Sequence, residues 1–406
     1  MAGPLAGYKV LDMSRVLAGP WAGQMLADLG AEVIKIERPA VGDDTRHWGP
    51  PYLQDSAGKN TQDAAYFYCT NRGKQSVTVD FTQPEGQDII RQLASQCDVL
   101  IENYKVGGLK QYGLDYSSLQ PLNPKLVYCS ITGFGQTGPY AQRPGYDFLI
   151  QGMGGLMSIT GEPDNQAGGP VKVGVAVTDV FTGLYAANAI QGALLERHQS
   201  GLGQYIDLAL LDVQAAVLAN QASNYLIGGQ VPGRLGNAHP NIVPYQAFAT
   251  ADGHIILAVG NDNQFERLSQ VLEQPQWALD PEYKTNAARV KNRQQLCINI
   301  TRQLSERKSR EWLELFTEHQ IPCGPINSID EVFEDPQIVA RNMLVKLTDK
   351  RAGEVKLVGN PINYSRSQID YSVPPPKLGD DTATVLGEIL EYSQAELEAL
   401  RKKSII

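Results

Sequence analysis

Short apolar runs alternate with longer amphipathic segments over the first third of the chain. The segments at 18–29 and 84–95 are long enough for helices, and the nearly continuous apolar runs between them are typical of buried strands. Strands are predicted at 8–12, 32–37, 76–80, 98–102 and 125–131. This alternation predicts an α/β fold, in which a parallel sheet carries helices on both faces.

Residues 174–195 carry one carboxylate into an otherwise uncharged stretch. Asp179 stands at the predicted start of a long helix, and no charged side chain occurs from 180 to 195. Free N–H groups and the helix dipole stabilise an anion at such a position. One interpretation is that Asp179, or Thr178 beside it, is simply the N-cap residue. The other is that Asp179 is a reactive carboxylate, and the motifs described below favour it.

The composition changes after residue 228. The segment 228–244 is rich in Gly, Pro and Asn, which is typical of a domain boundary. It is followed by strands predicted at 254–260 and 323–326 and by helices predicted at 290–304 and 309–318. We therefore expect a second, smaller unit at 228–328 and a return path at 329–406.

The length of the chain indicates how many structural units it forms, and its net charge indicates which partners are disfavoured. A chain of 406 residues is long enough for two structural units. The 35 basic and 44 acidic side chains give a net charge of −9, which disfavours a nucleic-acid or anionic-membrane partner.

The five cysteines are scattered and lack CxxC spacing, so neither a disulfide framework nor a metal site is expected. A reducing compartment follows from this. No signal-peptide pattern opens the sequence. We expect a cytoplasmic protein, or an organelle-matrix protein if a leader precedes this chain.

The predicted strand ends combine cations with glycines. Ligands of parallel sheets bind at the carboxyl ends of the strands, and this combination suits a phosphate-bearing ligand. The cations there are Arg38, Arg72, Lys74 and Lys105, beside the glycine-rich loop 133–139. A dinucleotide-binding turn is the alternative, but residues 17–23 lack the three glycines at the spacing that it needs. A nicotinamide enzyme is therefore disfavoured.

Short motifs are spread over nearly the whole chain, at 10–12, 17–20, 30–38, 42–46, 71–74, 102–104, 133–140, 144–147 and 178–179. Together they resemble the class III coenzyme A transferase family of the CaiB/BaiF type, which includes formyl-CoA:oxalate CoA-transferase. Residues 223–228, 242–248 and 260–265 resemble the branch that contains succinate:hydroxymethylglutarate (glutarate) CoA-transferase.

The resemblance implies an enzyme that moves coenzyme A from an acyl-CoA donor, such as succinyl-CoA, to a free carboxylic acid, expected to be a dicarboxylate. Coenzyme A is then a substrate, with no permanently bound cofactor and no metal. The resemblance also implies an interlocked, ring-like homodimer. Its large Rossmann-like domain comprises 1–227 and 329–406, and its smaller α+β domain comprises 228–328.

Site residues follow from the resemblance by position. Asp179 matches the family's catalytic aspartate, a nucleophile that forms an anhydride and then a thioester. The family's coenzyme A contacts match Leu17, Ala18, Arg38, Asn103, Tyr104, Gly145, Tyr146 and Asp147. The cation pattern adds Arg72, Lys74 and Lys105. Candidates for binding the acceptor acid are Arg46, Arg234, His239, Gly260, Asn261 and Asp262, with Arg143 as a rival.

Two departures bear on the alternatives within the family. An acyl-CoA racemase needs a histidine where this chain has Tyr146, and tyrosine is a poor base at neutral pH. Leu17 replaces a glutamine of the oxalate enzyme, which disfavours a small polar acceptor such as oxalate. The motifs do not identify the donor, the acceptor, or the residue that binds the acceptor carboxylate.

Overall fold

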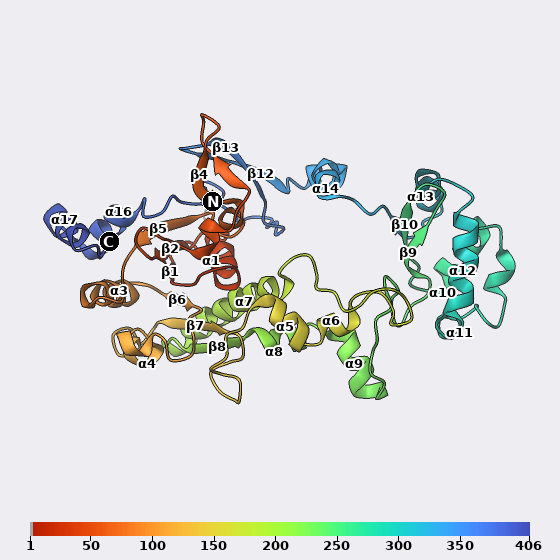
Figure 1. Ribbon diagram of the computed structural model, residues 1–406, viewed down its shortest axis with the longest axis horizontal. Helices are drawn as coiled ribbons and strands as arrows, with labels where there is room; N and C mark the ends of the chain where they lie inside the picture. Colours follow the sequence, from red (N-terminus) through yellow and green to blue (C-terminus); the bar gives the residue numbers. More distant parts are fainter. Residues whose placement is uncertain (1–2) are drawn as a thin grey trace. The chain divides into compact units, whose positions relative to one another are not determined.

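Residues 3–406 are described by a computed structural model, in which the chain forms two compact units (Figure 1). The first unit comprises the chain up to Gly154, together with Val173–Val217 and Pro336–Ile406. The second unit comprises Gly155–Lys172 and Leu218–Asp335. The stretch 228–328, expected as a small domain, falls inside the second unit.

A six-stranded parallel sheet forms the centre of the first unit, in the order β5-β2-β1-β6-β7-β8. Its strands are β1 (Lys9–Asp12), β2 (Glu32–Glu37), β5 (Lys74–Thr78), β6 (Val99–Glu102), β7 (Val127–Thr132) and β8 (Tyr205–Ala209). In the register, Val10 of β1 lies between Val33 of β2 and Val99 of β6. The expected parallel sheet is confirmed.

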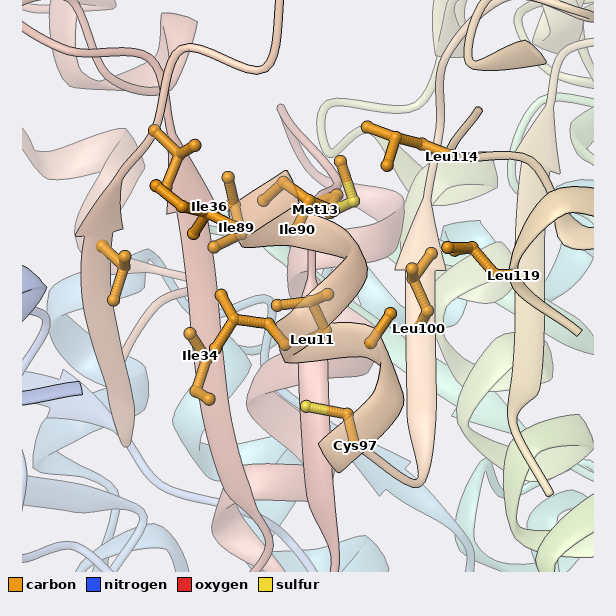
Figure 2. Close-up of a cluster of buried hydrophobic side chains, with 14 of the residues drawn as sticks. Leu11, Met13, Ile34, Ile36, Ile89, Ile90, Cys97, Leu100, Leu114 and Leu119 are labelled. Atoms are coloured by element: carbon orange, nitrogen blue, oxygen red, sulfur yellow. The ribbon is translucent and has the colours of Figure 1, made fainter. Parts of the chain in front are cut away.

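One face of this sheet packs against α3 (Pro84–Gln96). Leu11, Ile34 and Leu100 project from three neighbouring strands and pack with Ile89 and Ile90 of α3, as Figure 2 shows. The C-terminal helices α16 (Thr382–Leu390) and α17 (Gln394–Lys402) complete the same core. The end of the chain is therefore part of the first unit's hydrophobic core.

The opposite face packs against α1 (Ala18–Asp28) and α7 (Val177–Ser200). Ala22 and Leu26 of α1 share a core with Ala186 and Ile190 of α7. Small side chains at this contact let the two helices approach closely. At Gly183 an added Cβ would lie 2.8 Å from the carbonyl oxygen of Ala18, so only glycine fits there.

Shorter elements complete the first unit. Its hairpins are β3 (Tyr52–Gln54) with β4 (Asn60–Ala64), and β12 (Leu344–Asp349) with β13 (Gly353–Val358). Its other helices are α2 (Ala65–Tyr68), α4 (Tyr116–Leu119), α5 (Asp147–Met153), α8 (Leu210–Ala216) and α15 (Pro336–Ala340).

The second unit is built around a small antiparallel sheet. Its strands are β9 (Tyr245–Ala249), β10 (His254–Ala258) and β11 (Cys323–Gly324), with β10 in the middle. Its helices are α6 (Leu156–Ile159), α9 (Ala219–Gly228), α10 (Asp262–Val271), α11 (Asn286–Lys291), α12 (Arg293–Leu304), α13 (Ser309–Glu318) and α14 (Ile329–Glu334). Phe248, Leu257, Leu296 and Phe316 lie in its separate hydrophobic core.

Within residues 3–406, no helix combines the length and the apolar character that a membrane span requires.

Candidate active site

Asp179 lies in the first turn of α7, two residues after the helix begins at Val177. The N-cap residue is Ala176, whose side chain makes no capping hydrogen bond. The interpretation of Asp179 or Thr178 as the N-cap residue is therefore wrong. The carboxylate of Asp179 is not used to cap its own helix.

Asp147, the first residue of α5, satisfies the N–H groups at this helix end instead. Its Oδ1 accepts hydrogen bonds from the backbone N–H of Thr178 at 2.8 Å and of Asp179 at 3.3 Å. The predicted coenzyme A contact at Asp147 thus has a structural function in this chain. It places a second carboxylate beside Asp179.

The surroundings of Asp179 disfavour its ionised form. Burial and, after it, the charge of Asp147 raise the pKa of Asp179 to about 7. No donor within residues 3–406 hydrogen-bonds to its carboxylate. A carboxylate left without a partner and with a raised pKa at the edge of a helix is a candidate nucleophile or base.

The N-terminus of α1 lies one helical turn along α7 from Asp179. The contact at Gly183 brings α7 against Ala18 and Trp21. Leu17 and Ala18 are each only 4% exposed, so their side chains offer little surface to a ligand at this point. The first N–H groups of a helix bind anions, because they lack intrahelical acceptors.

The loop that leads into α1 is held in a strained form. Val16 has φ of 71°, which is uncommon for a β-branched residue. Asn103 accepts a hydrogen bond from the N–H of Arg15 at 2.9 Å and donates one to its carbonyl at 2.7 Å. The side chain of Asn103, a predicted coenzyme A contact, therefore shapes this loop.

Exposed cations follow the carboxyl ends of the strands β1, β2 and β6. Arg38 and Lys105 are exposed and have no acidic partner within 4.0 Å among residues 3–406. Arg15, which the motifs did not single out, lies with its guanidinium 5.0 Å from the ring centre of Tyr104. Arg38 and Lys105 are therefore free to bind an anionic ligand. Arg15 can bind one as well, although its guanidinium lies 3.4 Å from the carboxylate of Asp44.

Three other predicted cations face inward: Arg72 and Lys74, expected at the strand ends, and Arg46, expected to bind the acceptor acid. Arg46 pairs with Glu37 at 2.7 Å and with Asp63 at 2.6 Å. Arg72 pairs with Asp28 at 2.6 Å and Lys74 with Asp12 at 2.8 Å.

All three residues are at most 5% exposed, so these charges neutralise buried carboxylates. We therefore correct the expectation that Arg46, Arg72 and Lys74 contact a ligand. They hold the fold together in this structure.

Tyr146 and Gly145 precede α5 in a tightly packed segment. Tyr146 is 66% exposed and occupies the N-cap position of α5. An added Cβ at Gly145 would come within 2.4 Å of Gly133, so the loop after β7 and the start of α5 touch through two glycines. This contact holds Asp147 in register with the end of the sheet.

Trp48 and Tyr66 are further candidates that no motif indicated. Their rings pack edge to face, 5.2 Å apart. Burial, then Cys69, and then the charges of Asp179 and Asp147 raise the pKa of Tyr66 to about 12. Its phenol is therefore in the electrostatic reach of Asp179. Only the folded chain brings these residues together, which is why the sequence carried no signal.

The remaining predicted acceptor contacts belong to the second unit and are engaged there. Asn261 caps α10 by accepting from the N–H of Gln264, whose side chain in turn accepts from the N–H of Gly260. Asp262 pairs with Arg289 at 2.8 Å.

The two other acceptor candidates of this unit lie in its loops. Arg234 forms an ion pair with Asp164. The Nδ1 of His239 accepts from the N–H of Asn241 at 3.1 Å. The structure therefore shows no free cation at either position.

Comparison with known proteins gives a consistent result. The model of CoA-transferase family III matches residues 5–382. The chain is 54% identical over 386 residues to a succinate–glutarate CoA-transferase of Agrobacterium fabrum, covering 95% of this chain and 96% of that protein. It is 43% identical over 403 residues to the human succinyl-CoA:glutarate CoA-transferase, covering 99% and 90%. A crystal structure of a CaiB/BaiF family protein from Brucella suis superposes with a TM-score of 0.84 at 49% identity, covering 96% of this chain and all of that one.

Proposed function

Since the chain belongs to CoA-transferase family III, we propose that it moves coenzyme A from succinyl-CoA to a second dicarboxylic acid of the glutarate type, through covalent intermediates at Asp179. The family resemblance of the motifs is confirmed by the match over residues 5–382. The chain is a CoA-transferase, and coenzyme A is its substrate.

The first half of the proposed reaction releases the donor acid. A carboxylate oxygen of Asp179 attacks the thioester carbonyl of succinyl-CoA, the C–S bond breaks, and the CoA thiolate leaves with the electron pair. A mixed anhydride remains on Asp179. The thiolate then attacks the aspartyl carbonyl of this anhydride, which expels succinate and leaves an aspartyl-CoA thioester.

The second half runs the same steps in reverse with the acceptor. The acceptor carboxylate attacks the aspartyl thioester, and thiolate leaves again. The thiolate then attacks the acceptor carbonyl of the new anhydride, which yields acceptor-CoA and restores the carboxylate of Asp179. One thioester replaces another, so the exchange needs no oxidant and no nucleotide.

The observation that carries this proposal is the state of Asp179. Its pKa is raised, and no group among residues 3–406 donates a hydrogen bond to its carboxylate. The carboxylate is therefore poorly stabilised by its surroundings and more nucleophilic. The anionic part of coenzyme A would bind where Arg38, Lys105 and the N-terminus of α1 meet the carboxyl edge of the sheet.

We assign the distal carboxylate of the acceptor to Arg143. Arg46 is buried in ion pairs and Arg234 is paired with Asp164. Arg143 is exposed, forms no ion pair within residues 3–406, and lies over the ring of Tyr140 at 4.7 Å. Stacking of this kind orients a guanidinium for two-point recognition of a carboxylate. Arg143→Ala should then raise KM for glutarate far more than KM for a monocarboxylic acid of equal length.

We also propose a homodimer formed through α5 and α7. The exposed side chains of α7 include Leu184, Tyr185 and Leu195, and those of α5 include Phe148 and Leu149. Apolar surface of this extent is typical of a face that a partner covers.

A donor-by-acceptor assay tests the proposed function. Purified protein is incubated with succinyl-CoA, acetyl-CoA or formyl-CoA and with glutarate, hydroxymethylglutarate, mesaconate, oxalate or carnitine. Glutaryl-CoA or hydroxymethylglutaryl-CoA should form from succinyl-CoA, and Asp179→Ala should abolish it. Deuterium exchange at the α-carbon of an acyl-CoA without CoA transfer would instead favour the racemase alternative.

A further inference from the structure

Gln151 of α5 is a buried glutamine close to Asp179, and both its amide nitrogen and its amide oxygen form a hydrogen bond. Its Nε2 donates to Oδ2 of Asp147 at 2.7 Å, and its Oε1 accepts from the N–H of Val173 at 2.9 Å. Its side chain is 0% exposed. One amide therefore connects α5 to the segment that leads into α7.

Because of this contact, the two carboxylate oxygens of Asp147 accept hydrogen bonds from different groups. Oδ2 accepts from Gln151, which leaves Oδ1 for the N–H groups of Thr178 and Asp179. Without the donor on Oδ2, Asp147 could rotate about its side-chain bonds. The first turn of α7 would then lose the group that fixes it.

A second glutamine supports the same turn from α8. Gln214 accepts from the hydroxyl of Thr178 at 2.7 Å through Oε1, and its Nε2 has no partner among residues 3–406. Gln214 forms no hydrogen bond with Asp147 among residues 3–406, and the side-chain donor to that carboxylate there is Gln151.

We propose that Gln151 is a positioning residue for CoA transfer, which holds Asp147 against the first turn of α7 and thereby sets how Asp179 faces the thioester. Its catalytic importance rests on the proposed function of Asp179. Asp147 of α5 is the charged group that raises the pKa of Asp179, and the pKa of Tyr66 of α2 is raised in turn by the charges of Asp179 and Asp147.

Gln151→Met tests this role, since methionine fills a similar volume without hydrogen bonding. Released Asp147 would move its charge away from Asp179 and free the α7 N–H groups to stabilise the Asp179 carboxylate. Both effects lower the pKa of Asp179. We expect the midpoint of the pH profile of kcat/KM to fall by about half a unit or more and kcat to fall about tenfold, with KM for succinyl-CoA changed less than about twofold.

Gln24→Met is the matched control. Gln24 is also buried, and its amide also forms two hydrogen bonds, but both are to backbone groups, the carbonyl of Cys69 and the N–H of Arg72. This variant should lose stability without a change in the pH profile.

A double variant provides rescue. Asp147→Asn with Gln151→Glu exchanges donor and acceptor but preserves each hydrogen bond, because the new amide oxygen can still accept from α7 and the new carboxylate can accept from Val173. It should recover most of the kcat lost in Gln151→Met or in either single variant. This variant also keeps the test open if Gln151→Met does not fold.

The pKa of Asp179 can be measured without catalysis. It follows from how the free energies of unfolding of the parent and of its Asp179→Asn variant differ as the pH is changed. If Asp179→Asn retained activity, the proposed function would fail. The pKa of Asp179 obtained from unfolding would still show whether Gln151 positions Asp147. The positioning role is overturned if Gln151→Met behaves like Gln24→Met, with both kcat and the pKa of Asp179 unchanged. Absence of rescue in the double variant would also count against it.

Discussion

Asp179 derives its reactivity from what surrounds it rather than from its residue type. Burial and the neighbouring Asp147 raise its pKa to about 7, whereas the unperturbed value is 3.8. The carboxylate is thus available as a nucleophile near neutral pH but costs stability when it is ionised.

The cost in stability gives a test that needs no substrate. Between pH 4 and 7 the folded protein binds more protons at Asp179 than the unfolded chain does, so the free energy of unfolding falls as pH rises and levels off above 7. Asp179→Asn removes this effect. The variant should match the parent near pH 4 and exceed it at pH 8 by up to about 4 kcal/mol, because a pKa difference of one unit is worth about 1.4 kcal/mol. Urea unfolding at both pH values measures the difference, and a gap that did not grow with pH would contradict the account.

Arg38 is expected to act on binding rather than on chemistry. Its charge is unpaired among residues 3–406 and would meet a phosphate group of coenzyme A, which Arg38→Ala removes. The KM for succinyl-CoA should rise about tenfold, with a smaller change in kcat.

Arg310→Ala is the control for this variant, since Arg310 is also exposed but pairs with Glu314 on α13. Steady-state kinetics at low and moderate salt compare the two. An unchanged KM in Arg38→Ala would remove the phosphate role.

At the scale of elements, the site depends on how closely α7 approaches α1. Gly183→Ala would place a methyl group 2.8 Å from the carbonyl oxygen of Ala18 and 2.9 Å from Cβ of Trp21. The helices would separate, at a cost of about 1–3 kcal/mol. Because Asp179 lies one turn away, kcat should fall at least tenfold.

Gly192→Ala is the control on the same helix, because nothing lies within 4 Å of an added Cβ there. It should keep activity and leave stability unchanged or raised by up to about 1 kcal/mol. Thermal unfolding and kcat are measured on both variants. The comparison distinguishes the effect of disturbing the α1–α7 contact from the effect of replacing any glycine of α7 by alanine. Equal behaviour of the two would show that the approach of α7 to α1 is not needed.

The sequence predicted the central elements because their patterns are local. The strands β1, β2 and β6 and the helices α1 and α3 follow from apolar runs and helical spacing, and their ends were placed within two residues. The start of α7 was placed at Asp179 rather than at Val177, since its capping group comes from Asp147, thirty-two residues before Asp179.

Burial of charge could not be predicted in the same way. Arg46 lies between β2 and β3, and Arg72 and Lys74 lie at or just before the start of β5, where solvent-facing cations are common; only the folded chain shows their acidic partners. Gln151 carried no signal either, because its function depends on Asp147 and Val173 in three dimensions.

For the whole molecule, we expect dimerisation through the exposed face of α7. Leu195 is 69% exposed, and Leu195→Glu would bring a charge into the proposed interface. Sedimentation should show a dimer for the parent and a lighter species for this variant. Leu122→Glu, at a similarly exposed leucine outside α5 and α7, should remain a dimer. A monomeric parent, or a dimer that tolerates both changes, would contradict the proposed surface.

Covalent chemistry at Asp179 is the central claim, and trapping with hydroxylamine tests it most directly. The protein is incubated with succinyl-CoA and hydroxylamine, digested, and the peptide that contains residue 179 is analysed by mass spectrometry. The account predicts a hydroxamate on Asp179 that depends on succinyl-CoA. An enzyme that transfers CoA under these conditions while the Asp179 peptide stays unmodified would contradict it.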